Sequence, residues 1–329
     1  MSTYAYYPGC SGLGTSREYD TSTRAVCGAL GITLVDIPDW SCCGSTPAHT
    51  VDHLLSSALA ARNLALAEEL DPAAVITPCP SCLSNMKAAV HRMSDREFRL
   101  QVNRLLDKPV GKTTAVKSVL QVLAEEVGAE TVAGMLPDKP LAGLKLVPYY
   151  GCIMNRPPEV MQFDDHEHPM AMDRLMAALG AEVLPFPLKV ECCGASYGVA
   201  RKDIVARLSG KLLEAAEELG AHAIVTACPL CQMNLDLRQA QASAAADHRF
   251  EMPVFYYTQL LGLALNLPPE ELGLSKLCVN PEIAFESMRQ AQAEANAAAA
   301  AAATARENRE KAAKRPPKTT EQQAKAEER

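Results

Sequence analysis

Ten of the twelve cysteines fall into two sets that repeat in the same order along the chain, and this repeat constrains the fold more than any other feature. Each set has a single cysteine, then an adjacent Cys-Cys-Gly, then a Cys-x-x-Cys pair. The first cysteine set is Cys10, Cys42, Cys43, Cys79 and Cys82, and the second cysteine set is Cys152, Cys192, Cys193, Cys228 and Cys231. A repeat of this length indicates a duplicated structural unit. We expect the extra residues of the second copy in a loop near residues 164–169.

Strand-like and helix-like patterns alternate around the cysteines in both halves. In the first half we expect strands at residues 5–7, 32–37 and 74–77, and helices at 16–30, at 51–70 and from Pro80. In the second half we expect strands at 146–149, 182–186 and 223–226, and helices at 170–179 and up to 219. This alternation favours parallel sheets with helical crossovers. Every repeated cysteine lies at or after the end of an expected strand, where such sheets place their sites.

These patterns predict an α/β fold of two related, pseudo-symmetric domains with short parallel sheets, at residues 1–143 and 144–287. Residues 288–329 form a third segment, an alanine-rich and charged tail. Eleven of the fifteen residues from 291 to 305 are alanine, so the segment can be helical but has little to bury. We expect a solvated tail, with a docking helix for a partner subunit as the alternative.

Composition narrows the class of function. The net charge of −7 argues against a general nucleic-acid or anionic-membrane binder, which needs a basic surface. The start of the chain lacks the basic and apolar regions of a signal peptide, and the longest apolar stretch, residues 260–267, is too short to span a membrane. We therefore expect a cytoplasmic protein. Cytoplasmic thiols stay reduced, so twelve cysteines indicate metal or redox chemistry instead of disulfides.

Five cysteines per set is an unusual number of ligands. Structural zinc and a cubane [4Fe-4S] cluster each take four, so a fifth thiolate favours an iron–sulfur cluster of unusual shape over a structural zinc site. The adjacent cysteines can reach one metal centre only if the backbone bends after them. Gly44 and Gly194 follow the two pairs and allow such a bend.

The twin Cys-Cys-Gly sets, opening on Tyr6-Tyr7-Pro8-Gly9-Cys10, resemble the B subunit of coenzyme B–coenzyme M heterodisulfide reductase over about residues 3–283. The resemblance implies a noncubane [4Fe-4S] cluster on each cysteine set, two in all, and cleavage of a disulfide between them. Every cysteine position of the family motif is present. The catalytic positions carried across by the resemblance are Cys10, Cys42, Cys43, Cys152, Cys192 and Cys193, and the cofactor and metal ligands are all ten cysteines of the two sets.

The predicted function is therefore the catalytic subunit of a heterodisulfide reductase-like complex, an oxidoreductase acting on a sulfur group of a small-molecule or protein disulfide. The sequence has neither a ferredoxin cysteine run nor a Gly-x-Gly-x-x-Gly after a strand, so electrons must come from partners. The resemblance implies a ferredoxin-like iron–sulfur subunit (C-type) and a flavin-containing subunit (A-type). The alternative is a non-catalytic iron–sulfur electron-transfer subunit of an organic-acid or thiol-oxidising complex.

Two cysteines and two asparagines are not members of the two cysteine sets. Cys27 and Cys278 do not repeat, and we expect both to be buried as small apolar residues. Asn85 and Asn234 each follow a Cys-x-x-Cys by three residues. They suit either a hydrogen bond to a cluster sulfur or a role in the first helical turn.

Several polar residues near the Cys-Cys pairs are further candidates for binding. His49 and His53 have the i, i+4 spacing of two ligands on one helix, but their positions do not repeat, so we expect a polar helix face. Lys189, Arg201 and Lys202 flank the second pair and could meet an anionic substrate. We expect all three in solvent.

Overall fold

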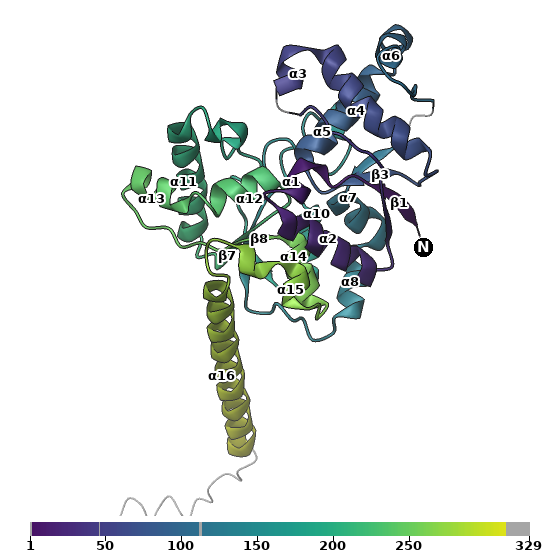
Figure 1. The fold of residues 1–329 in the computed structure, drawn as a ribbon. Coiled ribbons are helices and arrows are strands. Elements are labelled where there is room, and N and C mark those ends of the chain that lie inside the picture. The colour runs from purple at the N-terminus through teal and green to yellow at the C-terminus, as the bar shows by residue number, and fades with distance from the viewer. Residues whose placement is uncertain (1, 46, 112–113, 314–329) are drawn as a thin grey trace, which may run out of the picture. The chain divides into compact units, whose positions relative to one another are not determined.

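The structure is a computed structural model that describes residues 2–45, 47–111 and 114–313. Residues 1–288 form one compact unit, and the chain from residue 289 forms a second. The first unit contains two four-stranded sheets, in the orders β2-β1-β3-β4 and β6-β5-β7-β8 (Figure 1). All strand pairs in both sheets are parallel. The predicted α/β fold with two related short parallel sheets is confirmed.

The strands have matching places in the two halves. They are β1 Thr3–Tyr6, β2 Thr33–Asp36, β3 Val75–Thr77 and β4 Val116–Ser118 in the first, and β5 Lys145–Tyr149, β6 Glu182–Val183, β7 Ala223–Thr226 and β8 Val254–Tyr256 in the second. β3 and β7 are buried along their whole length, as expected of central parallel strands. β6 is shorter than the predicted 182–186 because Pro185 and Pro187 have no N–H to pair. The sequence patterns did not predict β4 and β8.

Helices connect the strands. The first half has α1 Gly9–Leu13, α2 Arg17–Ala29, α3 Pro47–Val51, α4 His53–Glu68, α5 Pro80–Arg92, α6 Arg96–Asn103, α7 Val119–Val122, η1 Leu123–Val127 and α8 Ala129–Met135. The second half has α9 Pro158–Met161, α10 Ala171–Ala178, η2 Ala195–Gly198, α11 Lys202–Glu218, α12 Pro229–Leu235, α13 Gln239–Ala246, α14 Tyr257–Ala264, α15 Pro269–Leu272 and η3 Leu274–Lys276. The helices predicted at 16–30, 51–70 and 170–179 are confirmed with slightly different ends.

Two prolines begin equivalent helices directly after a cysteine. Pro80 is the first residue of α5 and Pro229 the first of α12, where proline's fixed φ suits the helix and no N–H is lost. Cys79 and Cys228 are therefore the N-cap residues. This local geometry brings the last two cysteines of each set into the turn at the end of β3 or β7.

The two halves interlock through a shared core. Helix α2 of the first half packs against α14 and α15 of the second, and α10 of the second packs against α7 and α8 of the first. Tyr19 stacks on Tyr256 with ring centroids 4.0 Å apart, and its hydroxyl donates to the Ala227 carbonyl at 3.0 Å. Each half therefore completes the packing of the other. The domain boundaries at residues 143 and 287 stay a prediction.

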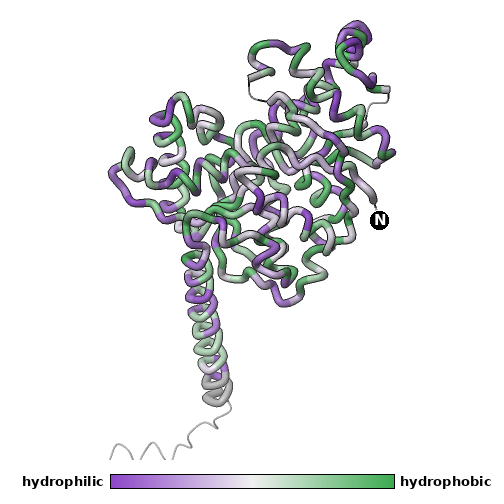
Figure 2. Tube along the Cα trace, in the orientation of Figure 1, coloured by the Kyte–Doolittle hydropathy of each residue, from purple (hydrophilic) through white to green (hydrophobic). Residues whose placement is uncertain are grey.

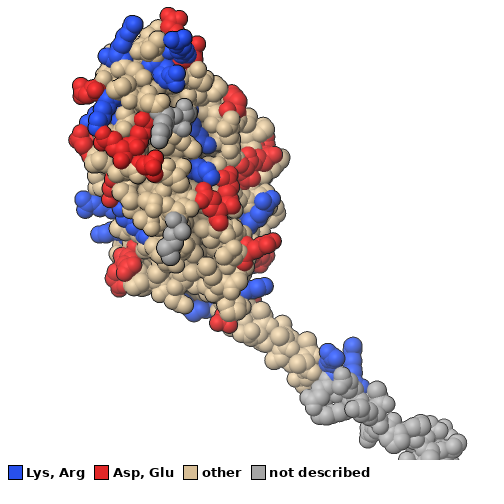
Figure 3. Space-filling model, turned by 90° about the vertical axis from the view of Figure 1, so that its right-hand side faces the viewer, with Lys and Arg blue, Asp and Glu red and all other residues tan. Residues whose placement is uncertain are grey.

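The alanine-rich segment is helical in the described residues. Helix α16, Glu282–Ala313, has every side chain from residue 293 to 306 exposed, and it mixes hydrophilic and weakly hydrophobic residues (Figure 2). Its exposure agrees with a solvated segment, whereas residues 314–329 lie outside the described residues. None of the described helices is long and apolar enough to cross a membrane. In the compact unit, acidic and basic side chains interleave over the face in Figure 3, as the modest net charge suggests.

Candidate iron–sulfur site

All ten repeated cysteines lie just beyond the carboxyl ends of three neighbouring strands in their half. In the first half, Cys10 is in α1 after β1, the Cys42–Cys43 pair follows β2, and Cys79 and Cys82 follow β3. The second half repeats this around β5, β6 and β7. Since neighbouring parallel strands end at one edge of a sheet, the five side chains of each set are gathered there. The predicted placement of the cysteines at strand ends is confirmed.

Sulfur atoms of the first cysteine set lie in direct contact. The Sγ atoms of Cys43 and Cys82 are 3.3 Å apart. A hydrogen bond also links Cys79 to Cys82, and Cys10 is close enough for its charge to interact with those of Cys42, Cys43 and Cys79. The structure therefore brings five residues, spread over 73 positions of sequence, into one sulfur cluster.

The second cysteine set has the same arrangement. The Sγ atoms of Cys193 and Cys231 are 3.7 Å apart. Cys231 is also hydrogen-bonded to Cys228, and Cys152 is hydrogen-bonded to Cys192. The contacts of the last three cysteines match those of the first set, whereas Cys10 interacts with Cys42 only through charge, so the repeat seen in the sequence extends to most of the thiol geometry.

Four glycines make this approach possible. Gly44 and Gly194, with φ of +76° and +90°, bend the chain after each cysteine pair, as predicted. Their N–H groups approach the Sγ atoms of Cys42 and Cys192 at 3.5 and 3.3 Å. Gly9 and Gly151 also have positive φ, and a Cβ added there would lie 3.1 Å from Cys82 Sγ and 2.9 Å from Cys231 Sγ. Sequence reasoning missed this second pair, although a glycine precedes the first cysteine of both sets.

Hydrogen bonds between neighbouring thiols lower the pKa of the accepting cysteine and raise that of the donating cysteine. Hydrogen bonding from Cys152 lowers the pKa of Cys192 to about 6, and hydrogen bonding from Cys231 lowers that of Cys193 to about 7. The pKa values of the donors Cys152 and Cys231 are raised in turn, with burial adding to the effect. Five crowded thiols cannot all ionise without a positive centre among them.

The donor set of each half fits an iron–sulfur cluster. Thiolates are the usual ligands of such clusters, and all twelve cysteines of the chain are free of disulfides. In the described ranges, no group of three or more His, Cys, Asp or Glu side chains is arranged to hold a single metal ion.

Two asparagines form hydrogen bonds with the backbone of the Cys-Cys-Gly turns. The Asn85 amide donates to the Cys43 carbonyl, while Ser56 Oγ donates to Asn85 Oδ1 at 2.8 Å. Asn234 Nδ2 lies 3.5 Å from both the carbonyl and the Sγ of Cys193, and 3.2 Å from the Ala195 carbonyl. Both asparagines hold the Cys-Cys-Gly turn, which was neither of the two predicted roles, and only Asn234 also reaches a cysteine sulfur.

A cleft of about 520 Å³ is bordered by residues next to cysteines of both sets. Ser81 lies between Cys79 and Cys82, and Ile153 directly follows Cys152. The other lining residues are Ser45, His49, Ser84, Asn85, Ala88, His91, Arg92, Pro157, Glu159, Val160, Ala195 and Leu230. Only the packing of the two halves brings these segments together, and no sequence signal marks His91 or Arg92.

The expectation that two histidines share a helix and the expectation that Cys278 is buried both need correction. His49 and His53 are not on one helix, because the chain breaks between α3 and α4, where Asp52 caps α4 by accepting from the Leu54 N–H at 2.7 Å. Cys27 is buried as expected, but Cys278 is exposed because it lies in the segment before α16 at the surface.

Lys189 is buried, in contrast to the solvated side chain expected. Its ammonium pairs with Asp173 at 2.7 Å. Arg201 and Lys202 are exposed as expected, and Arg201 pairs with Asp203 at 2.8 Å. The difference arises because the loop after β6 turns Lys189 towards α10.

Comparison with known proteins agrees with this site. The model of the CCG cysteine-rich domain matches twice, over residues 4–87 and 147–236. The chain is 37% identical over 275 residues to the 8-methylmenaquinol:fumarate reductase membrane anchor subunit of Wolinella succinogenes, covering 83% of this chain and 95% of that protein. It is 31% identical to a protein of Archaeoglobus profundus named as similar to the heterodisulfide reductase B subunit, covering 85% and 96%.

A third relative is the B subunit of the ferredoxin/F420H2-dependent CoB-CoM heterodisulfide reductase of Methanosarcina acetivorans, at 29% identity over 84% of this chain and 93% of that protein. The fold resembles a crystal structure of a hypothetical protein from Helicobacter pylori, with a TM-score of 0.66 and 13% identity. That match covers 85% of this chain but about half, 52%, of the other. With both domain matches spanning the two cysteine sets, the chain belongs to the family of CCG cysteine-rich domain proteins, which includes proteins named as B subunits of heterodisulfide reductase.

Proposed function

We propose that this chain is the catalytic subunit of a heterodisulfide reductase-like complex and carries two noncubane [4Fe-4S] clusters, one on each cysteine set. The observation that carries the proposal is the single cleft bordered by residues next to cysteines of both sets. A disulfide bound there would have one cysteine set on each side. Relatives named as heterodisulfide reductase B subunits, similar over most of the chain, support the same assignment.

The residues of the chain supply binding and protons in this proposal. When bound, the clusters supply single electrons, two of which reduce one disulfide to two thiols. His49 and His91 border the cleft and can donate protons to the thiolates that form. Arg92, whose Nη1 lies 3.4 Å from Ser57 Oγ, can bind an anionic group of the substrate.

Electrons must come from other subunits. A ferredoxin-like iron–sulfur subunit and a flavin-containing subunit are the proposed donors, and the word ferredoxin in the name of a relative supports the first of them. We also propose a cytoplasmic location, since free thiols at all twelve cysteines suit a reducing compartment.

The proposal is tested with protein purified without oxygen. It should contain about eight iron atoms per chain and, with a reduced viologen as donor, reduce the mixed disulfide of coenzymes B and M. Arg92→Ala should raise the KM about tenfold, whereas Arg201→Ala, which removes an exposed arginine outside the cleft, should not. Stoichiometric zinc with little iron would end the proposal. So would unchanged turnover in Cys10→Ser or Cys152→Ser, because each variant should lose one of two required clusters.

A second candidate is an electron-transfer subunit of a quinol:fumarate reductase-type complex. The observation in its favour is the 37% identity to a subunit of such a complex over nearly its whole length. In that case the iron content would be similar, but the disulfide would not be reduced. Electrons would instead pass from a quinol through the complex to fumarate, and the isolated chain would be oxidised or reduced without turning over either compound.

A further inference from the structure

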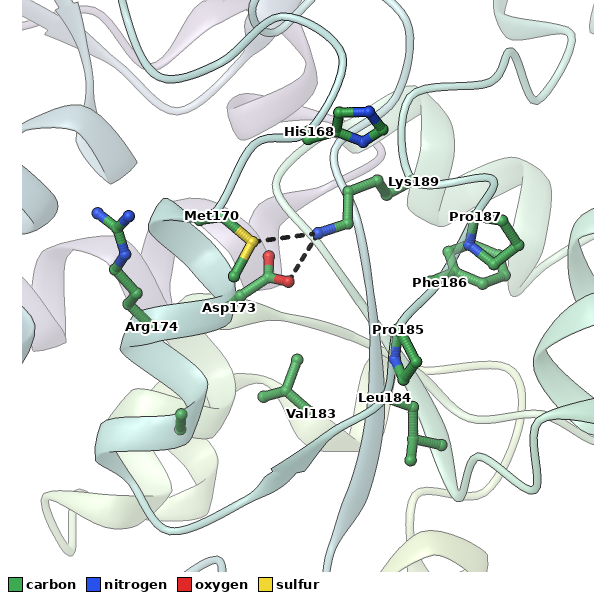
Figure 4. Close-up of a pocket in the computed structure, with 11 residues that line it drawn as sticks. His168, Met170, Asp173, Arg174, Val183, Leu184, Pro185, Phe186, Pro187 and Lys189 are labelled. Atoms are coloured by element: carbon green, nitrogen blue, oxygen red, sulfur yellow. Dashed lines mark hydrogen bonds and ion pairs between the residues drawn. The ribbon is translucent and has the colours of Figure 1, made fainter.

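A second cavity shares none of its lining residues with the cleft. It has a volume of about 530 Å³, which is in the usual range for small-molecule sites. Its walls include Met170 and the continuous stretch Val183–Pro187 that leaves β6 (Figure 4). Ala177 of α10 and the exposed residues His168 and Arg174 also line it. Most of the lining side chains are apolar, so the cavity favours a ligand with a large apolar surface.

One wall carries a buried ion pair. The Lys189 side chain crosses to α10, where its Nζ lies 2.7 Å from Asp173 Oδ1 (Figure 4). The Nζ also lies 2.9 Å from the Pro169 carbonyl, just before α10. The two side chains are only 11% and 9% exposed, and Tyr150 donates to the other oxygen of Asp173 at 2.7 Å. Burying charges costs free energy that such a pair seldom repays by stability alone, and this pair lies on a cavity wall where a ligand can reach it.

The ammonium retains one hydrogen-bond donor for a ligand. Of its three N–H groups, two are used by Asp173 and Pro169, and the third contact is the sulfur of Met170 at 3.8 Å. A thioether is a weak acceptor, so a ligand oxygen would replace it at little cost. The cavity thus combines mostly apolar walls with one buried donor, since Arg174 is exposed and points away from Lys189 (Figure 4), and this suits an uncharged ligand that carries a carbonyl oxygen.

The backbone of Lys189 is hydrogen-bonded to the segment that leads into the second cysteine set. The carbonyl of Lys189 accepts from the N–H groups of Tyr150 and Gly151 at 2.8 and 3.1 Å, and Cys152 comes next in the chain. Since successive Cα atoms are about 3.8 Å apart, the Cα atoms of Tyr150 and Cys152 are within about 8 Å. The residue that would hold the ligand is therefore fixed by its backbone to the segment that carries Cys152.

We propose that this cavity binds a quinone-class molecule, a flat apolar ring with carbonyl oxygens, and that Lys189 donates to one of those oxygens. The inference rests on the second candidate function and specifies where its quinol would bind. A charged ligand would lose its hydration against the apolar walls, and a hydrocarbon would leave the Lys189 donor unused.

Binding is measured by isothermal titration calorimetry on the full, iron-loaded chain, with 2,3-dimethyl-1,4-naphthoquinone as the probe. Both ring positions that could react with a thiol are blocked in this compound. We expect saturable binding at one site, and at least tenfold weaker binding of 2,3-dimethylnaphthalene, which has the same shape without oxygens. Equal binding of the two compounds would overturn the role of Lys189.

Two variants locate the site. Ala177→Phe places a ring in the cavity from an exposed helix position, and it should weaken quinone binding at least tenfold. Ala245→Phe, at an exposed position of α13 outside the cavity, is the matched control and should bind normally. Lys189→Met should weaken binding about tenfold. Unchanged affinity in Ala177→Phe would overturn the inference, whereas the iron content and disulfide assay of the unaltered chain decide separately between the two candidate functions.

Discussion

Replacing Gly151 with alanine should disrupt the second cysteine set while leaving the first intact. Gly151 has a φ of +74°, a conformation that costs a residue with a Cβ about 1–2 kcal/mol. The new methyl would also lie 2.9 Å from Cys231 Sγ, which forces the sulfur or the backbone to move. Overpacking of this kind costs about 1–3 kcal/mol more. The total expected loss of stability is therefore about 2–5 kcal/mol.

Gly220 provides the matched control. Its φ of +70° is nearly the same, but an added Cβ would have no atom within 4 Å. Gly220→Ala should therefore cost only the backbone term of about 1–2 kcal/mol. The difference between the two variants isolates the contact with Cys231.

The assay compares thermal unfolding, iron content and cluster spectra of protein purified without oxygen. Gly151→Ala should have the lower melting temperature and lose up to half of its iron, while Gly220→Ala keeps its full iron content. Gly9→Ala, where the added Cβ would lie 3.1 Å from Cys82 Sγ, should affect the first set in the same way but less strongly. Equal stability and equal iron in the Gly151 and Gly220 variants would refute the close approach of backbone and sulfur.

Three other perturbations test the assignment. Cys43→Ser and Cys193→Ser should each perturb one cluster spectrum and spare the other; simultaneous loss of both signals would contradict separate sites. Deletion after Ser287 should leave iron content and folding almost unchanged, because side chains 293–306 are exposed and Met288 is only partly buried against the core; aggregation of the shortened chain would show that α16 is structural. Burial lowers the pKa of Lys87 to about 8. The unfolded chain then binds more protons than the folded one above this pH, so denaturant titrations should find stability rising from about pH 8 towards 10, and this increment should be absent in Lys87→Met.

Local patterns were sufficient to predict most of the fold around the site. Buried strands such as Val75–Thr77 are short apolar runs, and their register with a following cysteine repeats in both halves. The strand predicted to extend to residue 186 was wrong beyond Val183, because two prolines remove the N–H groups it would need. The strands β4 and β8 carry no repeated cysteine, and their three residues are too few for a period to be recognised.

At the candidate site, the features that sequence order determines can be distinguished from those that depend on tertiary contacts. Which thiols belong together follows from sequence order, because parallel strands and right-handed crossovers bring successive strand ends to one edge. The glycine bends at Gly44 and Gly194 are also local, since only the conformation of one residue is involved. The sequence by itself therefore determined the α/β class, the duplication and the grouping of the cysteines.

Contacts between distant segments were decided only by the tertiary structure. Tyr19 stacks on Tyr256 across 237 positions of sequence, and this packing brings the two cysteine sets to one cleft. Lys189, in the loop after β6, pairs with Asp173 of α10, so a residue expected in solvent is buried. Such pairings depend on the summed packing of several helices and sheets, and no short pattern around either partner encodes them.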